Sequence, residues 1–144
     1  MLWATRHQIR VNRTATCWLV RRFIDPEATF LFVAPDSVAD AERDRGAIGF
    51  DAPNARYPHK DARGRCSFEA LVDAHRPNDR ALAAMARIVH SADFADQLHT
   101  TPEGAGLRLI SQGFPLVTTD DHETAERAAF LYDAMYAALT AQEK

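Results

Sequence analysis

The apolar positions of this chain follow a helical spacing through its second half. Leu82, Met85, Ala86 and Val89 recur every three or four residues, which puts them on one face of a helix expected over 79–94. A last helix is expected from a Thr119/Asp120 cap to the C-terminus, with the apolar stripe Ala125, Ala128, Tyr132, Met135, Tyr136 and Leu139. Both stripes predict helices that bury one face.

The first half of the chain predicts shorter elements. Strands are expected over 2–5 and 28–34, and helices over 13–24 (capped by Asn12), 36–45 (ended by Gly46) and 67–75 (capped by Ser67). A further helix is expected to follow 101–103 and to run to about Gly113. Residues 47–65 carry Pro53, Pro58 and Gly64 and are expected to be irregular. The sequence thus predicts one α+β domain over 1–144, mainly α-helical, with about five to six helices and a small two- or three-stranded sheet.

Charge narrows the classes of partner. The formal net charge is −3, so no overall basic field attracts nucleic acid or an anionic membrane. The chain also lacks a basic recognition helix, and we expect no direct nucleic-acid binding. Apart from Lys60 and Lys144, the positive side chains are arginines. This imbalance fits either guanidinium recognition of oxyanions or a compositional bias that also enriches alanine.

The N-terminal residues show no apolar run of signal-peptide length, and no stretch approaches the roughly 20 apolar residues of a membrane-spanning helix. Cys17 and Cys66 are too few for a disulfide framework and fit a reducing compartment. We therefore expect a cytoplasmic protein without a membrane segment.

Several arginines cluster around the first predicted helix. Arg22 falls on its apolar stripe with Trp18, and Arg13, Cys17 and Arg21 follow one another on the adjoining face. With Arg6 and Arg10 upstream, these guanidinium groups can converge on a divalent oxyanion. The alternative is structural: Arg22 pairs with Asp25 or Asp93, and the other arginines are solvated.

The helix over 79–94 places a carboxylate on its apolar stripe, at Asp93. His90 lies three residues earlier, and Glu69 and His59 precede it in the chain. Two imidazoles and two carboxylates suit a single divalent iron, manganese or zinc ion, with Glu103 and Arg22 as supporting groups around the site. The alternative is a structural polar network without metal.

The two cysteines allow a redox hypothesis as well. Cys17 has arginines as helical neighbours and Cys66 follows Arg65, and nearby positive charge lowers a thiol pKa. Cys66 is the candidate redox thiol. Buried, unreactive cysteine is the alternative, because free cysteine is commonly a core residue.

Seven separated motifs resemble one family. They are WATR at 3–6, NRTATCWLVRRFIDPEATFLFV at 12–33, FDAPN at 50–54, CSFEAL at 66–71, ALAAMARIVHSAD at 81–93, PEGAGL at 102–107 and DDH…LYDAMY at 120–136. In this order they resemble the C-terminal domain of the chromate-resistance protein B family. Asn12 departs from the aspartate usual in that family, which removes a charged neighbour of Arg13.

The resemblance implies a domain of chromate stress sensing or detoxification that binds metal or chromate. It favours Arg6, Arg13 and Arg21 as oxyanion-binding residues beside the His59, Glu69, His90 and Asp93 centre. Two other functions stay open: a metal-dependent enzyme of redox or hydrolytic type, and a docking module, either as a homodimer or on a separate regulator. The sequence does not decide whether the chain is an enzyme.

Overall fold

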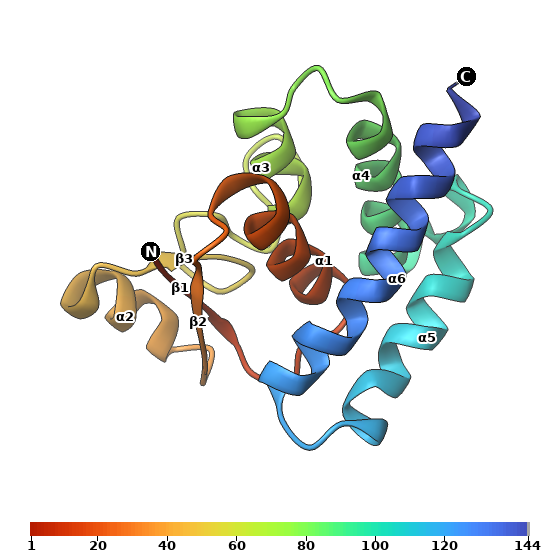
Figure 1. Cartoon of the computed structure of the whole chain (residues 1–144). Coiled ribbons are helices and arrows are strands. Elements are labelled where there is room, and N and C mark those ends of the chain that lie inside the picture. Colours follow the sequence, from red (N-terminus) through yellow and green to blue (C-terminus); the bar gives the residue numbers. More distant parts are fainter. Residues whose placement is uncertain (144) are drawn as a thin grey trace.

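The computed structural model describes residues 1–143 and shows a small sheet packed beside a larger helical body (Figure 1). In chain order the elements are β1 (Leu2–Arg6), α1 (Val11–Leu19), the π-helical turn η1 (Val20–Ile24), β2 (Thr29–Val33), α2 (Ser37–Arg45), β3 (Ile48–Gly49), α3 (Ser67–His75), α4 (Arg80–Asp93), the 3₁₀ turn η2 (Ala95–Thr100), α5 (Gly104–Val117) and α6 (Asp121–Gln142). The α+β, mainly helical fold expected from the sequence is confirmed.

The three strands are parallel and run in the order β2-β1-β3. β1 is central, and Trp3, Ala4 and Thr5 are buried because neighbouring strands and layers cover them on all sides. The short strand β3 lies inside the segment that we expected to be irregular. Two residues are too few to show the alternation of a strand in sequence, and β3 is a strand because it pairs with β1.

The two faces of the sheet pack against different helices. Trp3 and Phe30 join the main core formed with α1, α3, α4 and α6. Ala4 joins a smaller core with Val38 of α2 on the opposite face. The sheet is therefore a middle layer between α2 and the helical body (Figure 1).

Helix α6 holds the beginning of α1 in place. Tyr132 is fully buried, and its hydroxyl lies 2.6 Å from Thr14 Oγ1 and donates to the Val11 carbonyl at 3.1 Å. Asp121, at the start of α6, accepts the Gln8 and Ile9 amides at 3.0 and 2.9 Å. The loop between β1 and α1 is thereby fixed from the far end of the chain.

Three expectations about helix ends are corrected. Asn12 does not cap the first helix; it lies inside α1, buried, and its side chain donates to Ser67 Oγ and accepts from the Phe68 amide. Cys66 rather than Ser67 caps α3, and α5 continues past Gly113 to Val117 in spite of Pro115. The Asn12 side chain is engaged by tertiary contacts with α3, whereas the α3 cap is a local capping box between Cys66 and Glu69.

Helices α5 and α6 leave an apolar face open on the molecule. Leu109, Ile110, Leu116, Val117 and Phe130 are all at least half exposed, and a groove of about 450 Å³ runs between the two helices beside them. No helix among residues 1–143 is long and apolar enough to cross a membrane.

Candidate anion-binding site

A polar cavity of about 150 Å³ opens where the first turn of α1 meets the end of α4 and the middle of α5. Its wall consists of Arg6, Arg10, Val11, Asn12, Arg13, Asp51, Asp93, Arg108, Ser111 and Gln112. Four arginines stand against two aspartates in this wall, so the cavity carries an excess of positive charge and suits a small anion.

The helix end in this wall adds to the attraction for anions. Arg10 occupies the N-cap position of α1, its side chain makes no cap hydrogen bond, and the first turn contains no acidic residue. The amide groups of a helix N-terminus carry partial positive charge and bind oxyanions. The start of α1 thus presents uncapped amides to the same cavity as the arginines.

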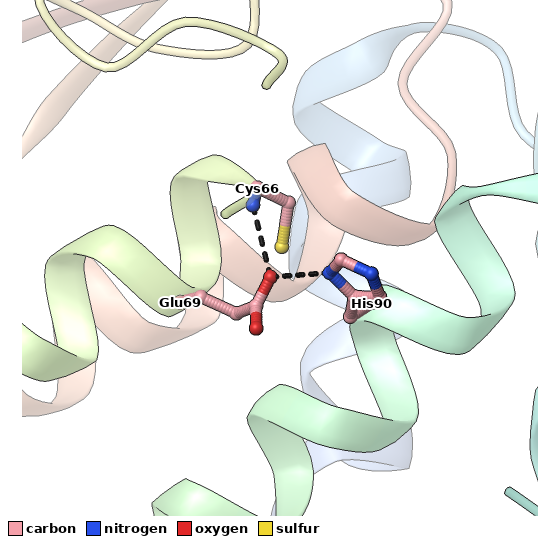
Figure 2. A group of neighbouring side chains, drawn as sticks. All are labelled: Cys66, Glu69 and His90. Carbon is pink, nitrogen blue, oxygen red and sulfur yellow. Dashed lines mark hydrogen bonds and ion pairs between the residues drawn. The ribbon is translucent and has the colours of Figure 1, made fainter. Parts of the chain in front are cut away.

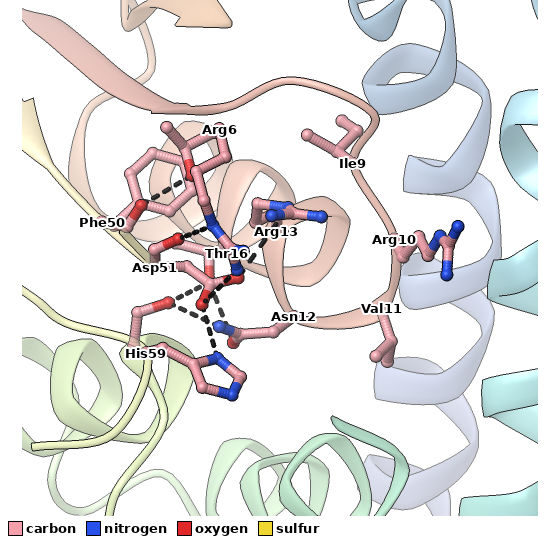
Figure 3. Close-up of polar contacts among 12 residues, drawn as sticks. Arg6, Ile9, Arg10, Val11, Asn12, Arg13, Thr16, Phe50, Asp51 and His59 are labelled. Atoms are coloured by element: carbon pink, nitrogen blue, oxygen red, sulfur yellow. Dashed lines mark hydrogen bonds and ion pairs between the residues drawn. The ribbon is translucent and has the colours of Figure 1, made fainter. Parts of the chain in front are cut away.

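Asp51 organises one side of the cavity (Figure 3). It is 2% exposed, and its carboxylate lies 2.7 Å from His59 Nδ1, 3.1 Å from Arg6 Nη2 and 3.8 Å from Arg13 Nε. Burial alone would raise the pKa of Asp51, but the His59 hydrogen bond and the two arginines outweigh burial and hold that pKa below its usual value. Asp51 is therefore an ionised anchor that positions Arg6 and Arg13.

The same contacts act on the partners of Asp51. The hydrogen bond to Asp51 raises the pKa of His59 despite the partial burial of the imidazole. Burial lowers the pKa of Arg13, and the charge of Asp51 opposes that change. At neutral pH the guanidinium of Arg13 remains charged, because an arginine pKa begins far above this range.

Asp93 differs from Asp51 in its surroundings. Burial and the neighbouring charge of Asp51 raise the pKa of Asp93 to about 6, although His59 and the arginines act in the opposite sense. Its Oδ2 atom is buried and accepts no hydrogen bond from any residue of the described chain, 1–143. His59 Nδ1 lies 3.6 Å from this oxygen but donates to Asp51 instead. The cavity wall therefore contains one unused acceptor.

Arg10 and Arg108 supply the uncompensated positive charge. Among residues 1–143, neither forms a salt bridge with a carboxylate. Arg108 donates from Nη1 to the carbonyl groups of Ala92 and Asp93 at 2.9 and 3.2 Å, which fixes the guanidinium over the end of α4. The charge of both groups is free to meet an anion.

A second polar group lies where α3 begins beside the last turn of α4 (Figure 2). Glu69 Oε1 accepts the Cys66 amide at 2.9 Å and lies 2.5 Å from His90 Nδ1. Donor atoms of Cys66, Glu69 and His90 all lie within 4.8 Å of one another. Sulfur, carboxylate and imidazole at this spacing can converge on one divalent ion.

The four metal ligands expected from the sequence are divided between these two places. Glu69 and His90 lie together, whereas His59 and Asp93 line or adjoin the arginine cavity. The ring of Phe94 packs on both imidazoles, with centroids 5.0 Å from His59 and 4.6 Å from His90. A ligand set restricted to Cys66, Glu69 and His90 is what the geometry brings together.

The remaining predicted residues lie elsewhere. Arg21 is outside the cavity wall: it donates to the Ala28 carbonyl at 3.4 Å and stacks over Phe30. Arg22 pairs with Asp133 of α6 at 2.5 Å rather than with Asp25 or Asp93. Glu103 is exposed at the start of α5, and no hydrogen bond or ion pair within 1–143 joins its carboxylate to either group.

Neither cysteine is activated in the way the flanking arginines suggest. Burial raises the pKa of Cys66 well above its usual value, and the charge of Glu69 adds to that effect. Burial likewise raises the pKa of Cys17, although Arg21 acts against it. Both thiols are therefore protonated in the absence of a metal, and the redox hypothesis loses its electrostatic basis.

Asp51 and Arg108 were not predicted as site residues, and the sequence left Arg10 open between oxyanion binding and a solvated position. A signal for Asp51 was present, because the FDAPN motif sets a charged residue directly after a buried phenylalanine. The position of Arg108 depends on how α5 crosses the end of α4, and no local pattern reports that crossing.

Two comparisons with known proteins show the family of the chain. The profile of the family described as "ChrB, C-terminal domain" matches residues 3–139. Protein ChrB of Cupriavidus metallidurans is 32% identical over 145 aligned residues, which cover 99% of this chain and 42% of that protein. The chain thus spans less than half the length of this relative. No solved structure matches the chain. The chain belongs to the ChrB C-terminal domain family.

Proposed function

We propose that this chain is a chromate-resistance domain that binds a small tetrahedral oxyanion, chromate in the first instance, in the cavity at the start of α1. The observation that carries the proposal is the convergence of Arg6, Arg10, Arg13 and Arg108 on an uncapped helix end. Guanidinium groups and helix amides together form the donor set that oxyanions prefer. The binding event fits sensing or handling of chromate stress, which family membership suggests.

The arrangement favours a bound ligand over a structural role for the arginines. Asp51 partly neutralises Arg6 and Arg13, but Arg10 and Arg108 have no carboxylate partner within the described residues. Gathering like charges around an empty cavity is unfavourable, and a dianion offsets that repulsion. Ser111 and Gln112 in the same wall offer further polar contacts to a ligand.

Arg10→Ala tests this proposal, because Arg10 is exposed and holds no other residue in place. Removing one charge-assisted hydrogen bond costs about 1.5–3 kcal/mol, so we expect chromate affinity to fall about 10- to 100-fold in calorimetric titrations at low salt. Arg87→Ala, at an exposed arginine of α4 outside the cavity wall, is the matched control and should bind as the wild type does. If Arg10→Ala and the wild type bind chromate with equal affinity, this cavity is not the oxyanion-binding site.

A metal-binding function is a second candidate, favoured by the Cys66, Glu69 and His90 group. Three ligand types from two rigid helices, with Glu69 and His90 partly exposed, leave a route for an ion and a position for a water ligand. Iron, manganese and zinc remain the candidates, and the thiolate favours zinc or iron over manganese. Phe94 packs on His90 of this group and on His59, whose Nδ1 is hydrogen-bonded to Asp51 of the arginine cavity.

A further inference from the structure

The unused oxygen of Asp93 is the least expected feature of the arginine cavity. A buried carboxylate oxygen without a hydrogen-bond donor is costly, and Asp93 Oδ2 has none within residues 1–143. The side chain is 12% exposed and lines the cavity beside Arg13 and Arg108. A donor for this oxygen can come from the ligand itself.

The ligand that meets this requirement carries its own proton. An ionised carboxylate repels a fully deprotonated oxyanion but accepts a hydrogen bond from an X–OH group. Hydrogen phosphate and hydrogen chromate carry such a group near neutral pH, whereas sulfate does not, because hydrogen sulfate is a far stronger acid. Chromate and sulfate have nearly the same shape and charge, so the proton is the property by which a site can separate them.

We propose that Asp93 is a specificity-determining residue that selects a singly protonated tetrahedral oxyanion and rejects sulfate. In the complex the hydroxyl of the oxyanion donates to Asp93 Oδ2, while the arginines and the start of α1 hold the remaining oxygens. The inference rests on the proposed oxyanion-binding function of this cavity.

The groups that face Asp93 leave its Oδ2 atom free to accept a proton-bearing oxygen of the ligand. His59 approaches Oδ2 at 3.6 Å, but its Nδ1 is engaged by Asp51. Asp51, Arg6 and Arg13 act on Asp93 through their charge, and Arg108 binds the Asp93 main-chain carbonyl rather than its carboxylate. None of these groups donates a hydrogen bond to Asp93 Oδ2, so none of them competes with the hydroxyl of the oxyanion for this oxygen.

Calorimetric titration of phosphate, chromate and sulfate into the wild type and Asp93→Asn at pH 7.5 tests the inference. The asparagine amide can donate to an unprotonated oxygen, so the variant should gain sulfate affinity. We expect the wild type to bind phosphate or chromate at least tenfold more tightly than sulfate, and Asp93→Asn to reduce that ratio to within about threefold. Asp96→Asn, an exposed acid in η2, should leave the ratio unchanged.

The outcomes distinguish failure of the Asp93 selection from failure of oxyanion binding by the cavity. A wild type that binds sulfate as tightly as phosphate and chromate, or a ratio unchanged in Asp93→Asn, overturns the role of Asp93 and leaves oxyanion binding in place. Absence of binding by all three anions in both proteins overturns the proposed function itself. Binding of phosphate with no binding of chromate supports selection for the proton and names phosphate as the ligand.

Discussion

At the scale of single residues, the two cysteines give a direct test of metal binding. Both thiols are buried, but Cys66 alone lies beside Glu69 and His90 among the described residues. We expect Co²⁺ to produce a thiolate charge-transfer band in the wild type that is lost in Cys66→Ser and kept in Cys17→Ser. Burial raises the pKa of the Cys66 thiol, and the metal must displace its proton. Apparent Co²⁺ affinity should therefore rise about tenfold per pH unit between pH 6 and 8.

The cysteine pair also sets the condition under which the metal hypothesis fails. Serine is close to cysteine in size, so Cys66→Ser should remain folded by circular dichroism. An identical cobalt spectrum in Cys66→Ser, or no cobalt binding by the wild type, would leave Glu69 as part of the α3 cap and His90 as its hydrogen-bond partner.

The sequence could predict the placement of residues that lie within helices, though not their role. His90 lies on the last turn of α4 and Glu69 on the first turn of α3, so the spacing along each helix indicated the side from which each side chain leaves. Asp51 could not be found in this way, since it follows β3 with a φ of 51° in an irregular segment. Its role depends on partners from β1, α1 and residue 59 that only the folded chain brings together.

At the scale of elements, Gly104 determines how closely α5 approaches α4. A Cβ atom at this position would lie 2.6 Å from Ser91 Oγ and 2.9 Å from the Leu98 carbonyl oxygen. Gly104→Ala should therefore lower the free energy of unfolding by about 1–3 kcal/mol, because the helix start must move. The same movement displaces Arg108, one turn later, and should weaken oxyanion binding.

Gly106 is the matched control on the same helix. Nothing lies within 4 Å of a Cβ at Gly106, and the residue is inside α5. Gly106→Ala should raise the free energy of unfolding by about 0.5–1 kcal/mol, since alanine is the better helix former. Urea denaturation of both variants measures the difference. Equal effects of the two substitutions would show that the α4–α5 approach is not tight.

Most helices and strands could be predicted from the sequence, but the residues at which some of them begin or end depend on contacts with other elements. The long apolar stripes of α4 and α6 predicted nearly the full residue range of both helices. The first helix begins at Val11 instead of Arg13 because Asn12 is used to join α1 to Ser67 and Phe68 of α3. Its final turn is the π-helical η1, and no periodicity distinguishes that turn from a continuing α-helix.

At the scale of the whole molecule, the anion site costs stability that the ligand can restore. The pKa of Asp93 is raised from 3.8 to about 6, so the folded state holds this proton more tightly than the unfolded chain does. The stabilisation from the protonated carboxyl is fully present below pH 3.8 and is lost as pH rises through about 6. At neutral pH an ionised Asp93 therefore destabilises the empty protein.

Asp93→Asn should consequently stabilise the protein in a pH-dependent way. The asparagine carries no charge at any pH, so the variant should gain up to about 3 kcal/mol of unfolding free energy at pH 8, from a shift of about two units. The gain should shrink as pH falls from 6 and vanish near pH 4. Urea denaturation without phosphate or sulfate at pH 4.5, 6 and 8 measures it, with Asp96→Asn expected to differ little from wild type at each pH. A loss of stability at pH 8 would instead mean that the arginines hold Asp93 ionised as a favourable partner, and the carboxylate would then have no need of a proton from the ligand.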